Sequence, residues 1–194
     1  MQKDRYTCYH GTIQKFADNI KNTKKFKIEN RNNHWLGNGV YFFVNNFFEA
    51  EWWSKQAKKK FIRENEPDEP KVKRQVIRLQ VNINPKRLLD LDVVSEFDDL
   101  NYFILELGKE NIHIFDPNKN HHDKEIERCS IIDLYVKYKE YKAACYTFES
   151  KAELNKRSNN LMISIGLKKH AKQLCVFDQS IIDFDTYKEM IHDE

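Results

Sequence analysis

The stretch HWLGNGVYFFVNNFFEAEWW, residues 34–53, decides most of the structural interpretation. It is rich in aromatic side chains and contains two of the five glycines of the chain, Gly37 and Gly39. Glycine adopts positive φ without strain, and it lets a ligand or another segment approach the backbone closely. The residues after the glycine pair are β-prone and end in an Asn-Asn turn signal. The pattern predicts a glycine bend, a short buried strand and a helix from Glu49 to Asn65, with Tyr41 at the mouth of the bend.

A hairpin strand with aromatic core residues would explain this stretch equally well. A second segment, however, favours a ligand site. The residues Tyr6–His10 alternate like a half-buried strand, and Gly11 follows them directly. Three of the five glycines therefore lie where a predicted strand meets aromatic or imidazole side chains.

The two segments together resemble a known family. YHGT at residues 9–12, followed by LGNGVYF at residues 36–42, is similar to the first two signature segments of the diphtheria-toxin-like ADP-ribosyltransferases, which include the poly(ADP-ribose) polymerases and many small bacterial toxins. Residues 16–28 could supply the short helix and strand that the family has between the two segments. The resemblance covers the first third of the chain. It implies an α+β fold in which a split, mostly antiparallel sheet grips NAD between its halves.

The resemblance also implies how NAD is held. In the family, the histidine that matches His10 hydrogen-bonds the adenosine ribose, and the backbone of the glycine that matches Gly11 holds the nicotinamide amide. The tyrosine that matches Tyr41 stacks on the nicotinamide ring. A second aromatic side chain closes the other ring face, and Trp52 lies at the matching distance, although a core tryptophan is an equal alternative. The expected NAD-binding residues are His10, Gly11, Thr12, Gly39, Tyr41 and Trp52.

The third family segment departs from the pattern, because Gln173 stands where the family has its catalytic glutamate. A glutamine can hydrogen-bond ribose hydroxyls, but it adds no negative charge and accepts no proton from a nucleophile. This argues against elongation into poly(ADP-ribose). The candidates for a base are Glu149, Glu153, His170 and Asp178, with Glu149 preferred. The expected catalytic residues are Gln173, Tyr41, His10 and Glu149.

These residues favour a mono-ADP-ribosyltransferase that moves ADP-ribose from NAD to a macromolecule, with NAD as co-substrate and no metal. An intracellular bacterial toxin or defence protein, such as a phage-defence or toxin–antitoxin component, fits the resemblance, and a neutralising antitoxin is a candidate partner. Two other functions stay open, a non-catalytic NAD or ADP-ribose binding module and an NAD glycohydrolase with water as acceptor.

The expected acceptor is single-stranded nucleic acid, RNA or DNA, with protein as the alternative. The acceptor loop of the family corresponds to residues 149–160, ESKAELNKRSNN, a modestly basic sequence that suits phosphate contacts. Phe148 before it could stack on a base or lie in the core. The basic runs Lys21–Lys27 and Lys55–Arg63 are further phosphate contacts or solvated helix faces.

Composition sets the remaining limits. The length of 194 residues predicts one domain, residues 1–194, and the net charge of +3 says little about partners. No apolar run is long enough to span a membrane, and the first residues lack a signal-peptide pattern, so we expect a cytoplasmic protein without a membrane partner. The four scattered cysteines predict reduced core residues. The polar surroundings of His121–Asp123 indicate a solvated loop and not a metal site.

The hydrophobic pattern and the capping residues predict the other elements. Thr12 caps a helix to Asn19, Ser95 caps a helix to Leu107 that Gly108 ends, residues 126–143 form a helix, and a short helix begins at Tyr187. The expected strands are residues 75–81, 87–91, 145–148, 161–165 and 173–177, and residues 111–125 are expected to be irregular.

Overall fold

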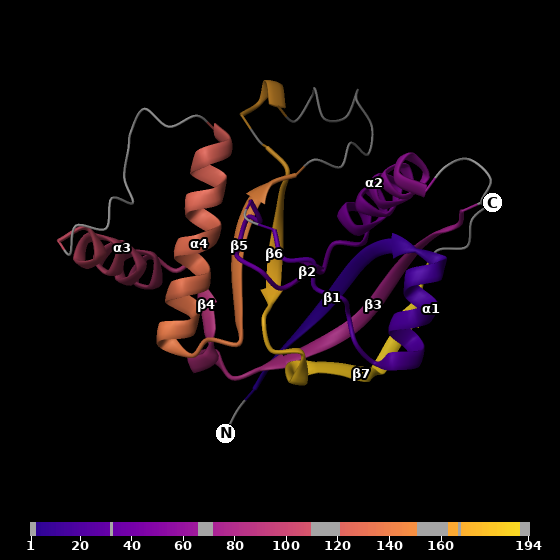
Figure 1. Ribbon diagram of the computed structural model, residues 1–194, viewed down its shortest axis with the longest axis horizontal. Coiled ribbons are helices and arrows are strands. Elements are labelled where there is room, and N and C mark those ends of the chain that lie inside the picture. The colour runs from indigo at the N-terminus through magenta and orange to yellow at the C-terminus, as the bar shows by residue number, and fades with distance from the viewer. Residues whose placement is uncertain are drawn as a thin grey trace.

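The computed structural model describes residues 3–31, 33–65, 72–109, 121–150, 163–166 and 168–190. They form an α+β structure with a seven-stranded sheet in the order β4-β5-β6-β2-β1-β3-β7 (Figure 1). The sheet is antiparallel except for the parallel pair β4–β5. The strands are β1 (Asp4–Ile13), β2 (Val40–Val44), β3 (Arg74–Ile83), β4 (Leu88–Asp90), β5 (Ala143–Glu149), β6 (His170–Val176) and β7 (Ile182–Glu189). The helices are α1 (Gln14–Thr23), α2 (Phe47–Asn65), α3 (Val94–Lys109) and α4 (His121–Lys139), with the 3-10 turns η1 (Pro85–Arg87) and η2 (Gln179–Ile181). The predicted α+β class with a mostly antiparallel sheet is confirmed.

The sheet opens between β1 and β2. β1 pairs with β3 along its whole length, from Asp4 to Ile13. With β2 it shares only two registered pairs, Cys8 with Val44 and Tyr9 with Phe43. The two strands then diverge, and Figure 1 shows β5 and β6 running at an angle to β1 and β3. Only this short stretch of ladder therefore joins β4-β5-β6-β2 to β1-β3-β7.

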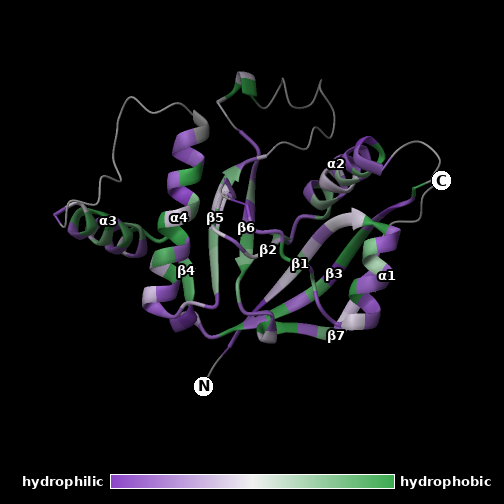
Figure 2. Ribbon diagram, in the orientation of Figure 1, coloured by the Kyte–Doolittle hydropathy of each residue, from purple (hydrophilic) through white to green (hydrophobic). Residues whose placement is uncertain are grey.

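The core fills both faces of the sheet, and hydrophobic residues gather along the strands in Figure 2. Tyr41 and Phe43 lie two positions apart on β2, so they point to the same face. Phe43 packs with Ala171 in a cluster under α2, whereas Tyr41 packs with Cys175 in a cluster toward α4. On β6, Gln173 lies between Ala171 and Cys175 on this same face. The polar side chain of Gln173 therefore lies between the two apolar clusters.

The Asn-Asn turn starts α2 as the sequence suggests. Asn45 has φ 51°, and the Asn46 side chain accepts a hydrogen bond from the backbone N–H of Glu49 at 3.2 Å. This is an N-cap with a glutamate at the third helical position. The helix therefore begins at Phe47, two residues before the predicted Glu49, and it extends to Asn65, the last described residue before the gap at residues 66–71.

Three residues predicted to start or end a helix are misplaced. Thr12 is buried inside β1, and α1 begins after Ile13, which makes no side-chain capping bond. Ser95 and Gly108 both lie within α3. Propensity alone misplaced the start of α1, because pairing of β1 with β3 extends the strand as far as Ile13.

Other boundaries also need correction. Residues 121–125, predicted to be irregular, open α4, so the predicted loop at His121–Asp123 is helical. The same helix ends at Lys139, before the predicted Ala143, because Glu140 has φ 55° and Ala143 begins β5. No strand occurs within residues 24–28.

In the C-terminal half, the sequence predicted the wrong kind of secondary structure for two segments. Residues 163–164 are helical and 165–166 form a turn, not the predicted strand 161–165, whose first two residues lie outside the described part. The segment from Tyr187 belongs to strand β7, because it pairs with β3. The strands predicted at 75–81, 145–148 and 173–177 are confirmed, whereas 87–91 holds the end of η1 and the shorter strand β4.

The four cysteines are free and buried, as predicted. Within the described ranges, no cluster of His, Cys, Asp and Glu side chains is arranged to hold a metal ion. Among the same residues, none of the helices has the length and hydropathy needed to cross a membrane.

Candidate functional site

A cavity of about 330 Å³ lies where the sheet opens between β1 and β2. Its lining comes from β1, the segment before β2, β2 itself, α2 and β6. The lining residues are His10, Gly11, Arg31, Asn33, His34, Trp35, Tyr41, Phe43, Trp53 and Gln173. Four of the sequence-predicted site residues, His10, Gly11, Tyr41 and Gln173, therefore meet in one cavity.

His10 is a fixed, neutral hydrogen-bond acceptor. Its Nδ1 lies 2.9 Å from the carbonyl oxygen of Tyr41. A carbonyl can only accept, so Nδ1 carries the proton and Nε2 is the acceptor. The ring packs edge-on against Phe26 and Phe42, and burial lowers the pKa of His10 below its ordinary value. This imidazole is neutral at pH 7 and bridges the point where β1 and β2 part.

Tyr41 offers its ring to the cavity but not its hydroxyl. The hydroxyl accepts a hydrogen bond from the Leu36 backbone N–H at 2.7 Å and donates one to the Gly37 carbonyl at 2.9 Å. Burial raises the pKa of Tyr41, so the hydroxyl stays protonated. These two bonds close the glycine bend, and the partly exposed ring is the surface left for a ligand.

The glycines are required by packing as well as by any ligand. A Cβ at Gly11 would lie 1.9 Å from the Ala50 carbonyl oxygen, so only glycine lets β1 pack this closely on α2. Gly37 has φ 83°, and a Cβ at Gly39 would lie 2.6 Å from Cys175 Sγ. Gly39 and the buried Thr12 do not line the cavity. Their expected contact with NAD has no geometric support.

Gln173 floors the cavity. It is 6% exposed, and in the sheet it lies opposite Phe43 of β2 and Tyr146 of β5. Within the described part of the chain its side-chain amide makes no hydrogen bond. Buried amides are almost always hydrogen-bonded. A buried amide without a partner among the described residues is therefore a candidate donor and acceptor for a ligand.

The proposed bases lie elsewhere. Glu149 is exposed at the end of β5 and forms an ion pair with Lys168 at 3.2 Å. His170 is exposed opposite it. Asp178 is paired with Lys142 at 2.6 Å, and this hydrogen bond helps to lower the pKa of Asp178 to about 2. Glu153 lies outside the described residues. Among the described residues, no carboxylate lines the cavity.

The aromatic side chain of α2 that lines the cavity is Trp53, whereas the sequence suggested Trp52. Trp53 lines the cavity and lies nearly parallel to Phe43, with ring centroids 6.4 Å apart. Trp52 packs edge-on against Trp53 at 5.2 Å and is not part of the lining. One helical position rotates a side chain by about 100°, so distance along the sequence cannot distinguish the two.

Five lining residues besides Trp53 were missed by sequence reasoning. Phe43 could have been found, because it shares a strand face with Tyr41. His34 and Trp35 stand at the start of the aromatic stretch but match no family segment. Arg31 and Asn33 had no sequence signal.

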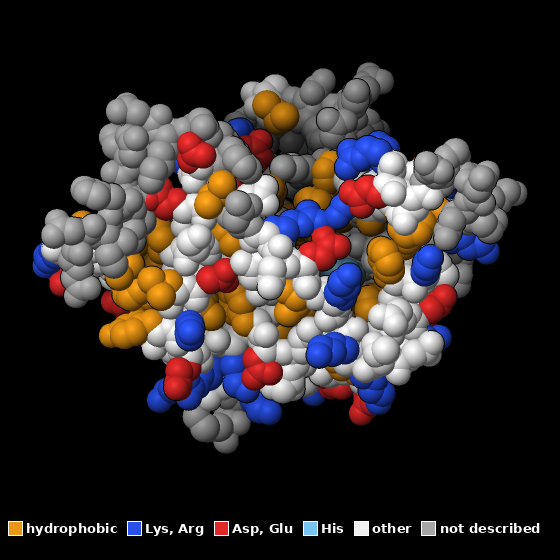
Figure 3. Space-filling view, viewed as in Figure 1, with side chains coloured by type: hydrophobic (Ala, Val, Ile, Leu, Met, Phe, Trp, Pro, Cys, Tyr) orange, Lys and Arg blue, Asp and Glu red, His pale blue; other side chains and the backbone are white. Residues whose placement is uncertain are grey.

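Both basic and acidic side chains lie beside the opening of the smaller cavity. Arg31 is hydrogen-bonded to Glu29, which also accepts a hydrogen bond from Lys60 of α2 at 3.3 Å. The bond from Arg31 is the main cause that lowers the pKa of Glu29. Two cations thus share one carboxylate beside the cavity. In Figure 3, acidic side chains lie among the Lys and Arg side chains of the visible face, so this face shows no continuous basic surface.

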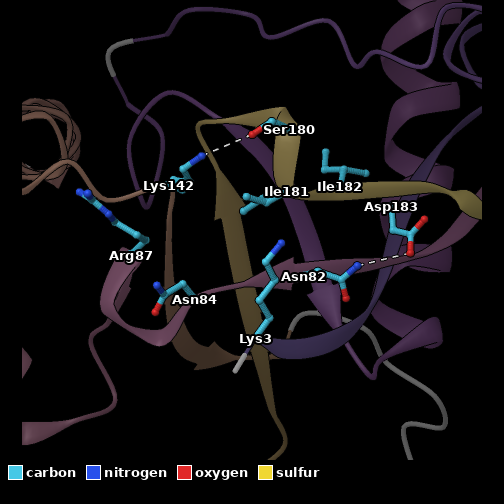
Figure 4. Close-up of a pocket in the computed structure, with 9 residues that line it drawn as sticks. All are labelled: Lys3, Asn82, Asn84, Arg87, Lys142, Ser180, Ile181, Ile182 and Asp183. Atoms are coloured by element: carbon cyan, nitrogen blue, oxygen red, sulfur yellow. Dashed lines mark hydrogen bonds between the residues drawn. The ribbon is translucent and has the colours of Figure 1, made fainter. Parts of the chain in front are cut away.

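A second, larger cavity of about 500 Å³ lies at the other end of β1 (Figure 4). Lys3 lies seven residues before His10, roughly 24 Å along an extended strand. Lys142 donates to Asp178 and Arg87 to Glu140, while Asn82 donates to Asp183 at 3.3 Å. The lining has no aromatic ring and consists of Lys3, Asn82, Asn84, Arg87, Lys142, Ser180, Ile181, Ile182 and Asp183. Most of its charged groups already have protein partners, so we place the candidate site in the smaller cavity.

The chain resembles an uncharacterized protein of Methanocaldococcus jannaschii, with 32% identity over 92 residues. The match covers 47% of this chain and 39% of that protein's length. No family model and no solved structure matches the chain.

Proposed function

We propose that the smaller cavity binds NAD and that the chain transfers a single ADP-ribose from NAD to a macromolecular acceptor in the cytoplasm. One observation carries the proposal. His10, Gly11, Tyr41 and Gln173 come from three segments far apart in sequence, and they line the same cavity. They are the residues that the resemblance to diphtheria-toxin-like ADP-ribosyltransferases marks as NAD contacts.

In the proposed complex, each of these side chains has a role. The nicotinamide ring lies against Tyr41, and Trp53 or Phe43 covers the other side of the cavity. His10 Nε2 accepts from a ribose hydroxyl, and the Gln173 amide bonds the hydroxyls of the nicotinamide-side ribose. The cavity lies at the small end of the usual range for ligand pockets. It therefore takes the nicotinamide and its ribose, while the phosphates lie at the mouth near Arg31.

The reaction breaks the bond between nicotinamide and the anomeric carbon of ribose. Nicotinamide leaves with the bonding electron pair, and the acceptor nucleophile bonds to the same carbon and loses its proton. Gln173 orients the ribose without adding charge, so we expect slow transfer of one unit and no polymer. Since no described carboxylate lines the cavity, the proposed base is water or a second group on the acceptor, which takes the proton that the nucleophile loses.

Single-stranded nucleic acid is the proposed acceptor. Trp35 lines the cavity and packs on Phe148 at 4.9 Å, and Tyr146 packs on Phe148 at 4.9 Å. All three are partly exposed, and such aromatic surfaces stack on unpaired bases. Of the acceptor loop, only Glu149 and Ser150 belong to the described residues.

Protein stays the alternative acceptor, because the basic runs are partly neutralised. Lys21 pairs with Glu189, Lys24 with Asp185 and Lys55 with Glu51. A second candidate function is a non-catalytic NAD or ADP-ribose binding module. Gln173 in place of a glutamate favours it.

Labelled NAD added to a cell lysate separates these functions. We expect label on a macromolecule that nuclease releases and protease does not. Release by protease alone would make protein the acceptor. Label found only on free ADP-ribose would indicate a glycohydrolase. Binding of NAD without turnover would leave a binding module, and the absence of binding would contradict the proposal.

A further inference from the structure

Asn38, between the two glycines of the bend, is the centre of a hydrogen-bond network that the sequence did not mark. Its backbone N–H donates to Asp133 Oδ1 at 2.7 Å, and its side-chain Nδ2 donates to Asp133 Oδ2 at 2.7 Å. Both oxygens of one carboxylate thus hold one residue of the bend. Bidentate hydrogen bonds of this kind, with an ionised acceptor, are short and directional.

The same residue holds the segment in front of the bend. Asn38 Oδ1 accepts a hydrogen bond from the Arg31 backbone N–H at 2.8 Å. The Arg31 carbonyl in turn accepts from Cys129 Sγ at 3.5 Å, and Cys129 lies one helical turn before Asp133 on α4. The backbone of Arg31 is therefore fixed to α4 on both sides.

The other side of the network leads to Tyr41. Gly37 is so close to α4 that a Cβ there would lie 2.4 Å from Asp133 Oδ1. The Gly37 carbonyl accepts the Tyr41 hydroxyl bond, and Leu36 N–H donates to that hydroxyl. The position of the Tyr41 ring thus depends on the glycine bend, which is hydrogen-bonded to Asp133 of α4.

We infer that Asn38 and Asp133 are a positioning pair, which sets Arg31 and Tyr41 on two sides of the cavity. Neither residue of the pair lines the cavity. The inference rests on the proposed function for its consequence, NAD binding. α4 has its own apolar anchors, Ile132, Tyr135 and Val136, so the helix can stay packed when the pair is broken.

A reciprocal exchange tests the pair. Asn38→Asp places a carboxylate against the Asp133 carboxylate, and Asp133→Asn places an amide NH₂ against the Asn38 NH₂. The double variant Asn38→Asp/Asp133→Asn restores one donor and one acceptor at each contact. It also keeps an acceptor for the Arg31 N–H. Asp183→Asn, which changes a carboxylate that accepts a hydrogen bond from Asn82 at the larger cavity, is the matched control.

NAD affinity is measured by calorimetry at a temperature where every variant is folded. We expect each single variant to bind NAD about tenfold more weakly, a loss of about 1.4 kcal/mol. The double variant should return to within about threefold of the original chain, and Asp183→Asn should not change the affinity. A merely structural role would lower the melting temperature and leave the affinity of folded protein unchanged.

Hydrogen exchange on the ligand-free protein makes the test independent of NAD. The N–H groups of Arg31, Leu36 and Asn38 should exchange about tenfold faster in each single variant, while Leu79 in β3 keeps its rate. The double variant should restore protection. Unchanged exchange in the single variants, or no recovery in the double variant, overturns the inference. If the original chain binds no NAD, the proposed function fails, and exchange alone decides whether the pair holds the bend.

Discussion

The two cavities lie at opposite ends of the same strand, β1, and differ in how their polar groups are satisfied. In the larger one, the cations Lys142 and Arg87 are held by carboxylates and the Asn82 amide by Asp183. In the smaller one, the Gln173 amide lacks a described partner and His10 keeps a free acceptor. Buried polar groups are normally paired within the protein, so an unpaired set beside aromatic surfaces marks a binding site better than volume does.

The sheet explains why the difference exists. β1 is paired with β3 at both ends, and beside its Asp4 end the polar side chains of the larger cavity bond one another. At the Gly11 end, β1 has left β2, and the His10 side chain substitutes for the missing ladder. The open ladder creates the cavity, and Gly11 lets α2 close it from one side.

The largest effect is expected for Gly11→Ala. The added Cβ would meet the Ala50 carbonyl at 1.9 Å, and overpacking of this kind costs about 3 kcal/mol or more. In Gly108→Ala, the matched control, the Cβ meets nothing within 4 Å inside α3, and the variant should gain about 0.5–1 kcal/mol. Thermal unfolding measures both. Equal stability of the two variants would contradict the close packing of β1 on α2.

Gln173→Ala should come next, because it removes the amide that orients the ribose. We expect ADP-ribose transfer to slow about a hundredfold, with little change in melting temperature because the amide makes no described hydrogen bond in the protein. Gln173→Glu should keep or raise NAD cleavage, since it adds the missing charge. A folded Gln173→Glu variant without activity would mean that the neutral amide is itself required.

Tyr41→Ala should weaken NAD binding about tenfold, since the ring stacks on nicotinamide. Tyr41→Phe keeps the ring but breaks the bonds to Leu36 and Gly37, so it should lower stability by about 1 kcal/mol and affinity less than Tyr41→Ala does. Tyr102→Ala, an exposed tyrosine of α3, is the control. Calorimetry that shows equal affinity for Tyr41→Ala and the original chain would exclude the stacking role.

Acid pH should lower both the stability of the folded chain and the affinity of the smaller cavity for NAD. Burial lowers the pKa of His10, so the folded chain binds fewer protons than the unfolded chain once the pH falls below about 6.5. The free energy of unfolding is therefore not reduced by His10 above this pH, and it decreases as the pH falls below it. NAD affinity should be constant above it too, and it should fall when Nε2 is protonated. The pKa of His34 is also lowered by burial, so His10→Gln should reduce the acid decline, not abolish it. An identical pH profile for His10→Gln would exclude this role of His10.

The sequence could predict those parts of the site that depend on a single segment. The glycine bend, the strand after it and the Asn-initiated helix follow from local preferences, and His10 and Tyr41 follow from the segments that carry the resemblance. Pairing with distant strands overrode these preferences at Thr12 and at Tyr187. Asp133 and Trp53 reach the site through the packing of α4 and α2, which no local pattern encodes.

The smallest effect is expected at the larger cavity, for Lys142→Ala. The Lys142 and Asp178 side chains are 40% and 42% exposed, and exposed ion pairs contribute only about 0.2–1 kcal/mol. Lys142 does not line the smaller cavity, and its charge is already paired with Asp178. NAD affinity should therefore stay within about twofold of the original value, a change below about 0.4 kcal/mol. A loss as large as that of Tyr41→Ala would mean that the two cavities share one ligand or are coupled.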